Sequence, residues 1–152
     1  MVLEVLRQLF ARDLDRLYQE VNAYPEESGL WVLSGQIANT GGNLCLHLLG
    51  NLQTYIGKEL GGVAYTRDRD AEFSLKNVPR KEMLEGILHT ARVVDDTLSH
   101  LKEEDLAKTF PVKVFSGETT TGFMLIHLAT HLSYHLGQIN YHRRLLDARA
   151  LS

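Results

Sequence analysis

The sequence is poor in the features that mark secreted, membrane-spanning and disulfide-stabilised proteins. It has one cysteine, Cys45, among 152 residues, which excludes an intrachain disulfide and predicts a reducing, cytoplasmic setting. No stretch approaches the roughly 20 consecutive apolar residues that a helix needs to cross a bilayer. Residues 1–7 carry charges at positions where a secretory signal peptide would be apolar, so no such peptide is expected.

The chain also lacks an excess of positive charge. Asp and Glu outnumber Lys and Arg by 19 to 16, which gives a net charge of −3. Basic residues form no block, and the pair Arg143-Arg144 is isolated. Proteins that bind nucleic acid or anionic membranes do so through clustered basic side chains. We therefore expect neither partner here.

Apolar residues recur every three or four positions along four segments, which is typical of amphipathic helices. The segments cover approximately residues 2–21, 42–60, 79–101 and 120–147. Four helices of this length favour an all-α fold, a four-helix bundle. The length of the chain predicts that residues 1–152 form a single domain. The long connection over residues 61–78 allows a crossover, so a simple up-and-down topology is not assured.

The segments between these helices are predicted to be ordered. Trp31, with its neighbours Leu30 and Val32, is expected to pack onto the helices. Residues 63–77 form a charged loop without the Gly- and Ser-rich composition of a flexible linker. Residues 110–115 alternate in polarity and are expected to be extended.

Arg67 and Arg69 lie in the charged loop and allow two interpretations. A guanidinium group binds carboxylates through paired hydrogen bonds, so these residues could clamp an anionic substrate. They could equally form ion pairs with the acidic residues beside them, and we favour that interpretation. The acidic neighbours are Asp68, Asp70 and Glu72.

Four of the seven histidines fall in the last predicted helix, at spacings of four, four and seven residues. At about 100° per residue, these histidines and one glutamine lie within an arc of roughly 80°. They are His127, His131, His135, Gln138 and His142. Such a polar stripe on an otherwise apolar helix must meet water or bind a group that prefers nitrogen ligands.

His131 and His135 have the spacing of a metal-binding pair. Imidazoles at positions i and i+4 of a helix can share one metal ion, as in the His-Glu-x-x-His zinc proteases. The residues between this pair are Leu132, Ser133 and Tyr134, so the glutamate base of those proteases is missing. A zinc-protease function is therefore excluded, and a third ligand must come from another helix.

His47 is the best candidate for the third ligand, because it is the one histidine of the second predicted helix. Asn51, one turn further on, is expected to support it through a hydrogen bond. Three neutral imidazoles leave positions open for water or substrate, which is the catalytic rather than the structural pattern. The alternative is that the histidines are solvated and bind no metal.

The motifs His47-Leu-Leu-Gly-Asn51 and His131-Leu-Ser-Tyr-His135-Leu-Gly-Gln-Ile resemble those of the DinB/YfiT-like superfamily of metalloenzymes. Together with residues 67–73, they look like a branch of that superfamily whose function is unknown. The resemblance covers nearly the whole chain. It implies a four-helix bundle, commonly a homodimer, with a divalent metal, nickel or zinc, on His47, His131 and His135.

The other members of the stripe do not match ligand positions in that resemblance. His127 and His142 are expected to support the ligands or to lie on the surface. Gln138 is expected either to support the ligands or to pack against the first helix. No catalytic acid or base can be identified from the sequence.

Some members of the superfamily are similar to transferases or isomerases that use a low-molecular-weight thiol, which the metal binds. The resemblance thus implies a metal-dependent enzyme acting on a small-molecule substrate, with thiol S-transfer ahead of hydrolysis. A metal ion lowers the pKa of a coordinated thiol or water, so this chemistry is physically sound. Two alternatives are a non-catalytic metal-binding or stress-related bundle, and a dimerising bundle without metal.

Overall fold

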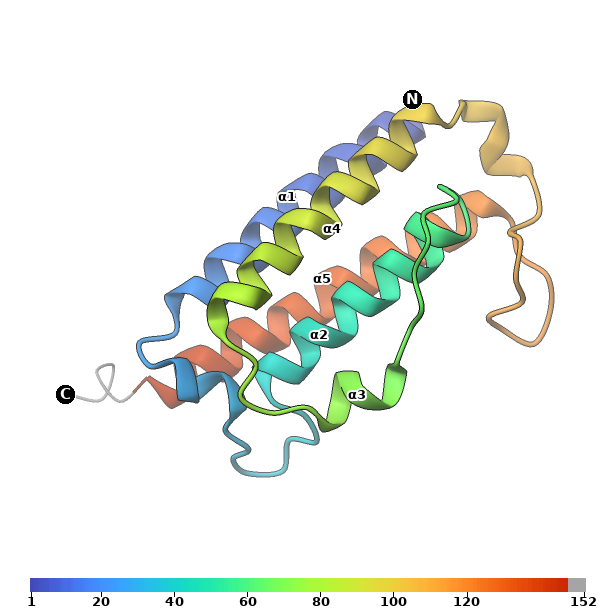
Figure 1. The fold of residues 1–152 in the computed structure, drawn as a ribbon. Helices are drawn as coiled ribbons and strands as arrows, with labels where there is room; N and C mark the ends of the chain where they lie inside the picture. Colours follow the sequence, from blue (N-terminus) through green and yellow to red (C-terminus); the bar gives the residue numbers. More distant parts are fainter. Residues whose placement is uncertain (148–152) are drawn as a thin grey trace.

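The computed structural model describes residues 1–147, in which four long helices lie side by side (Figure 1). These are α1 (Val2–Ala23), α2 (Gly41–Leu52), α4 (Arg80–His100) and α5 (Thr121–Leu146). The shorter elements are the 3₁₀ helices η1 (Glu27–Trp31) and η3 (Glu103–Ala107), the π-helix η2 (Gln53–Lys58) and the helix α3 (Arg69–Ser74). No strand occurs within residues 1–147, which confirms the all-α class. Over the same residues, no helix has the length and apolarity required to traverse a membrane.

Helix α1 forms because its apolar side chains repeat with helical spacing and cover one face. That face packs against α4 and α5, which bury it. Its buried apolar residues are Leu3, Leu6, Phe10, Leu14, Leu17 and Val21. Burying each aliphatic side chain of this size contributes roughly 1.5–3 kcal/mol. The helix ends at Ala23, one residue before the Tyr24-Pro25 pair, because a residue that precedes proline disfavours helical geometry.

Helices α2 and α5 are the pair that carries the histidines of interest. Each begins with a threonine cap: the Thr40 hydroxyl accepts from the Asn43 amide, and the Thr120 hydroxyl accepts from the Phe123 amide. Helix α2 is buried along almost its whole length, because α3, α4, α5 and η1 all pack against it. A polar side chain on α2 therefore meets other protein groups rather than water.

The second predicted helix, residues 42–60, is continuous, but its last part has a wider turn than expected. After Leu52 the backbone forms the π-helix η2, in which the Glu59 amide donates to the Thr54 carbonyl. π-helical turns are rare and often occur near functional sites. The helix stops where Gly62 adopts a φ of 67°, a conformation that favours glycine.

The connections differ from prediction in three places. The charged loop contains helix α3, whose first turn is capped by the Asp68 carboxylate, which accepts from the Ala71 amide. Near Trp31, Leu30 is buried as expected, whereas Val32 is exposed and the prediction for it was wrong. Residues 110–115 form no strand, although Phe110 at their start is buried against the core.

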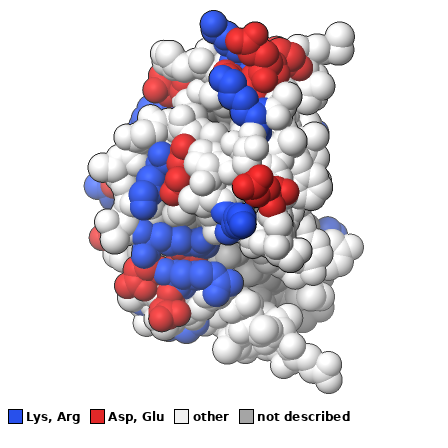
Figure 2. Space-filling view, turned by 90° about the vertical axis from the view of Figure 1, so that its right-hand side faces the viewer, with Lys and Arg blue, Asp and Glu red and all other residues white. Residues whose placement is uncertain are grey.

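Charged side chains of both signs are interspersed on the face drawn in Figure 2. Lys and Arg residues lie next to Asp and Glu residues over much of the left half of that view, and the right half is mainly uncharged. No patch of a single sign therefore dominates this face.

Candidate metal centre

The structure brings His47 of α2 together with His131 and His135 of α5. One ring nitrogen from each residue lies within 4.8 Å of the corresponding atoms of the other two. The closest pair is His47 Nε2 and His131 Nε2, 3.2 Å apart. His47 is buried, and the two α5 histidines are half-buried. We call these residues the histidine cluster.

The closest nitrogen pair of the cluster has the separation expected of two ligands on one metal ion. Imidazole nitrogens bind zinc at about 2.0–2.1 Å, so two ligands of a tetrahedral ion lie about 3.3 Å apart. The 3.2 Å separation of the two Nε2 atoms is close to that value. Within residues 1–147, no fourth His, Cys, Asp or Glu joins the cluster. The three nitrogens could therefore hold an ion while leaving one side of it open.

Protonation of the cluster is disfavoured by its surroundings. Burial, and then the neighbouring imidazoles of His135 and His47, lower the pKa of His131 to about 4. Burial also lowers the pKa of His135, although its hydrogen bond with Gln138 acts in the opposite direction. Both rings are thus neutral at pH 7, which is the form that binds metals.

In the metal-free protein we expect His131 to titrate near pH 4. Its unfolded-state pKa is about 6.5, so between these values the unfolded chain binds a proton that the folded chain does not. The free energy of unfolding should therefore decrease as the pH falls from about 6.5 to about 4. NMR titration of the imidazole signals, with His131→Ala to assign them, measures this pKa. A His131 pKa of 6.5 or above would contradict the prediction.

Gln138 lies beside the cluster as a partner of His135. Its Oε1 atom is 2.6 Å from His135 Nδ1, so the ring donates a proton to the amide oxygen. With the proton on Nδ1, the Nε2 lone pair of His135 is free for a metal. Of the two roles predicted for Gln138, this geometry favours support of a ligand.

The expected role of Asn51 as partner of His47 is corrected by the structure. Asn51 is buried, but its Oδ1 atom has no hydrogen-bond partner among residues 1–147. His47 Nδ1 lies instead 3.0 Å from Oε1 of Glu72, a buried residue of α3. Glu72 was expected only as an ion-pair partner of the loop arginines, because nothing local in the sequence links it to a histidine 25 residues away.

Arg67 binds the same carboxylate with two hydrogen bonds. Its Nε atom is 2.8 Å from Glu72 Oε2, and its Nη2 atom is 3.0 Å from Oε1. Burial on its own raises the pKa of Glu72, but the hydrogen bonds with His47 and Arg67 outweigh it and keep the pKa below its usual value. The ion-pair interpretation is confirmed for Arg67, whereas Arg69 lies over the ring of Phe73.

Asn43, in the first turn of α2, holds the segment that carries Glu72. Its side-chain amide donates to the backbone carbonyls of Glu72 and Leu75, at 2.9 and 2.8 Å. Its Oδ1 atom accepts hydrogen bonds from Thr40 and Lys76. Because Asn43 is fully buried, these bonds are shielded from water and fix α3 against α2.

Replacing Asn43 by alanine should reduce the free energy of unfolding by about 1–3 kcal/mol, because the buried carbonyl of Glu72 and the partly buried carbonyl of Leu75 lose their donor. The freed segment over residues 63–77 should also be cleaved faster by a protease under native conditions. Chemical denaturation and limited proteolysis measure the two effects. Asn22→Ala, at an exposed position of α1, is the matched control. Equal stability and equal cleavage in both variants would contradict this role.

The remaining stripe histidines lie outside the cluster. His142 is buried, with Nδ1 2.7 Å from the Tyr24 hydroxyl and Nε2 donating to the Val32 carbonyl at 2.8 Å. It joins the end of α5 to α1 and η1, which corrects the expectation of a surface or supporting residue. The His127 ring is stacked 6.1 Å from His131 and meets Phe115 edge-on at 4.9 Å.

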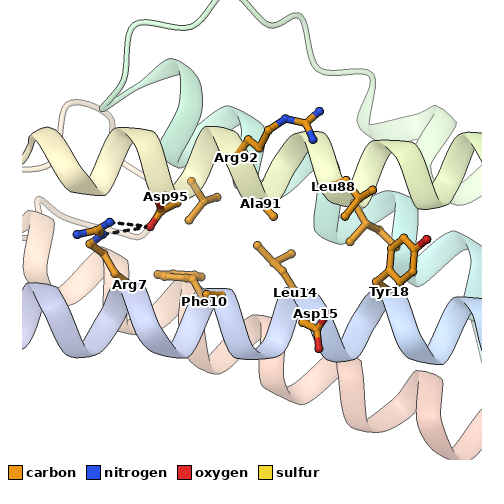
Figure 3. A pocket seen from close by; sticks show the side chains of 12 residues that line it. Arg7, Phe10, Leu14, Asp15, Tyr18, Leu88, Ala91, Arg92 and Asp95 are labelled. Carbon is orange, nitrogen blue, oxygen red and sulfur yellow. Dashed lines mark hydrogen bonds and ion pairs between the residues drawn. The ribbon is translucent and has the colours of Figure 1, made fainter.

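A groove of about 350 Å³ between α1 and α4 contains none of the cluster histidines (Figure 3). Its walls are mainly apolar, with Phe10, Leu14 and Ala91 facing one another. Asp15 and Arg92 also line it, but their side chains point away from the space between the helices. The Arg7–Asp95 ion pair closes one end at 3.0 Å, so these charges already satisfy each other. A reactive site needs polar groups that converge on a ligand, and the cluster offers them where the groove does not.

Comparison with known proteins gives one result that covers nearly the whole chain. The model of a family described as "Protein of unknown function (DUF1572)" matches residues 2–151, a range that includes the three cluster histidines and Glu72. No curated protein matches the sequence. The chain therefore belongs to the DUF1572 family of proteins of unknown function.

Proposed function

We propose that this protein is a metal-dependent enzyme that transfers a low-molecular-weight thiol to or from a small-molecule substrate. In this proposal it is a DinB/YfiT-like four-helix bundle, a cytoplasmic homodimer, and its histidine cluster binds one divalent ion. The observation that carries the metal site is the convergence of three imidazole nitrogens within 4.8 Å from two different helices.

The cluster residues supply the ligands through nitrogens that carry no proton. Nickel and zinc both bind imidazole well, so the identity of the ion depends on its availability in the cell. A catalytic site keeps an open position, and the lack of a fourth acidic, thiol or imidazole ligand within residues 1–147 supports that type of site. The bound ion would lower the pKa of a coordinated thiol and so favour the thiolate at neutral pH.

Neighbouring side chains hold the rings of the cluster in place. Phe73 packs against the His47 ring, with 4.9 Å between ring centroids. Gln138 and Glu72 bond the Nδ1 atoms of His135 and His47, so both rings are held in one orientation. The choice of thiol transfer over hydrolysis, and the homodimer, follow from the resemblance of the motifs to the DinB/YfiT-like superfamily.

The metal is tested by purifying the chain without a histidine tag and measuring bound nickel, zinc and other metals. We expect about one divalent ion per chain, removable with a chelator. Chains that bind no ion after incubation with either metal would disprove the metal site. Light scattering measures the oligomeric state.

The reaction is tested by incubating metal-loaded protein with several cellular thiols and an electrophilic acceptor, and following loss of free thiol. The chelator-treated protein is the control, and its rate should fall to that of buffer. Hydrolysis of ester or amide substrates without consumption of thiol would identify the protein as a metal-dependent hydrolase rather than a thiol transferase. A loaded site without turnover of either kind would identify a non-catalytic metal-binding protein.

A further inference from the structure

We infer that Glu72, held by Arg67, is a positioning residue that determines which nitrogen of His47 faces the histidine cluster. This inference rests on the proposed metal-binding function. It concerns a carboxylate that comes from helix α3, outside the two helices that carry the ligands.

Glu72 determines which nitrogen of the His47 ring carries a proton. An ionised carboxylate can only accept hydrogen bonds, so the 3.0 Å contact between Glu72 Oε1 and His47 Nδ1 requires the proton on Nδ1. A ring with its single proton on Nδ1 presents a bare Nε2 atom, and this is the atom that lies 3.2 Å from His131 Nε2. Metal-binding histidines commonly donate their second N–H to a carboxylate in this way.

Arg67 fixes the orientation of the carboxylate itself. Arg67 binds both oxygens of Glu72, so the group cannot rotate away from His47 without losing a paired interaction. Arg67 Nη2 also lies 3.5 Å from His47 Nδ1, but its 3.0 Å contact with Glu72 Oε1 is shorter. The guanidinium therefore compensates the buried negative charge, while the carboxylate faces the ring.

Helix α2 leaves space for this carboxylate. A β-carbon at Gly50 would lie 1.9 Å from Glu72 Oε2, so a larger residue at this position would displace the carboxylate. Glycine inside a helix is less favourable than alanine. Helix α2 thus carries an unfavourable residue, one turn after His47, where Glu72 needs room. Together with the Asn43 contacts, this fixes Glu72 from the backbone to the carboxylate.

Three variants test the inference in different ways. Glu72→Ala removes the acceptor, Glu72→Gln keeps its shape without its charge, and Gly50→Ala displaces the carboxylate while leaving it intact. Groups that support metal ligands typically contribute 10–100-fold to affinity. We expect the Kd for zinc to rise about 10–100-fold in Glu72→Ala and Gly50→Ala, and by less in Glu72→Gln. Glu82→Gln, at an exposed position of α4, should bind as the wild type does.

Two readouts separate positioning from a general loss of structure. The first is the ¹⁵N NMR tautomer of His47 in the metal-free chain, which we expect to be the Nδ1–H form in the wild type and a mixture in Glu72→Ala. The second is the absorption spectrum of the cobalt-loaded chain, which should change in the variants while their far-ultraviolet circular dichroism does not.

The outcomes for the inference and for the proposed function are distinct. If the wild type binds zinc and Glu72→Ala and Gly50→Ala bind it equally tightly, the inference is overturned while the metal site stands. If the wild type binds no metal, the proposed function fails, and the tautomer of His47 still decides the role of Glu72. The same tautomer in the wild type and in Glu72→Ala would overturn that role as well.

Discussion

Replacing His131 by alanine is expected to abolish tight metal binding. His131 is central in the cluster: its Nε2 atom lies 3.2 Å from that of His47, and its ring centroid lies 4.6 Å from that of His135. The two imidazoles that remain, those of His47 and His135, come from different helices, and no third cluster nitrogen is left to bind the ion. Residues that only support ligands contribute 10–100-fold, so losing a ligand should raise the zinc Kd by more than about 100-fold.

The same substitution should leave the metal-free fold intact. His131 Nδ1 is buried without a hydrogen-bond partner among residues 1–147, and burial lowers the pKa of the ring. Its removal therefore costs the metal-free protein little, and thermal unfolding in chelator should occur near the wild-type temperature. Competition with a chromophoric chelator measures the loss of affinity.

His127→Ala is the matched control for this loss. His127 lies one turn earlier on α5 and stacks near His131, but it is outside the cluster. We expect the zinc Kd of this variant to change only a few-fold. Wild-type affinity in His131→Ala, or an equal loss in both variants, would contradict the assignment of the cluster.

The parts of the structure that could be predicted are those with a local physical cause. Helix α5 was predicted over residues 120–147 and spans Thr121–Leu146, because apolar periodicity and a threonine cap both act within a few residues. The proximity of His131 and His135 follows from helix geometry alone. The pairing with His47 required only that the second and the last predicted helix be neighbours, as α2 and α5 are.

Glu72 could not be assigned to His47 in this way. Helix α3 has six residues, too few to show a helical period, and its position depends on the Asn43 hydrogen bonds to two backbone carbonyls. The choice of Asn51 as the partner of His47 failed for a related reason. It assumed that support comes from the next turn of the same helix, whereas a chain that folds back over α2 can deliver a carboxylate directly to the ring.

Leu132→Ala should lower the stability of the fold and keep metal binding, whereas His131→Ala should abolish metal binding and keep the stability. The two residues are adjacent in the sequence. Leu132 is fully buried in the core, about 100° around α5 from the cluster face. Truncating such a leucine removes its buried methyl groups and leaves a cavity, which costs about 2–5 kcal/mol of unfolding free energy. Chemical denaturation in chelator measures this loss, and the exposed Ser133→Ala should unfold as the wild type does.

Metal binding distinguishes the role of Leu132 in the core from the role of His131 in the cluster. A ligand that binds only the folded state at 100 times its Kd stabilises that state by about 2.7 kcal/mol. Zinc should therefore stabilise folded Leu132→Ala by about as much as the wild type, and His131→Ala hardly at all. This outcome would show that α5 uses one face for the core and the next for the metal. Folded Leu132→Ala that no longer binds zinc would instead show that the cluster depends on the packing beneath it.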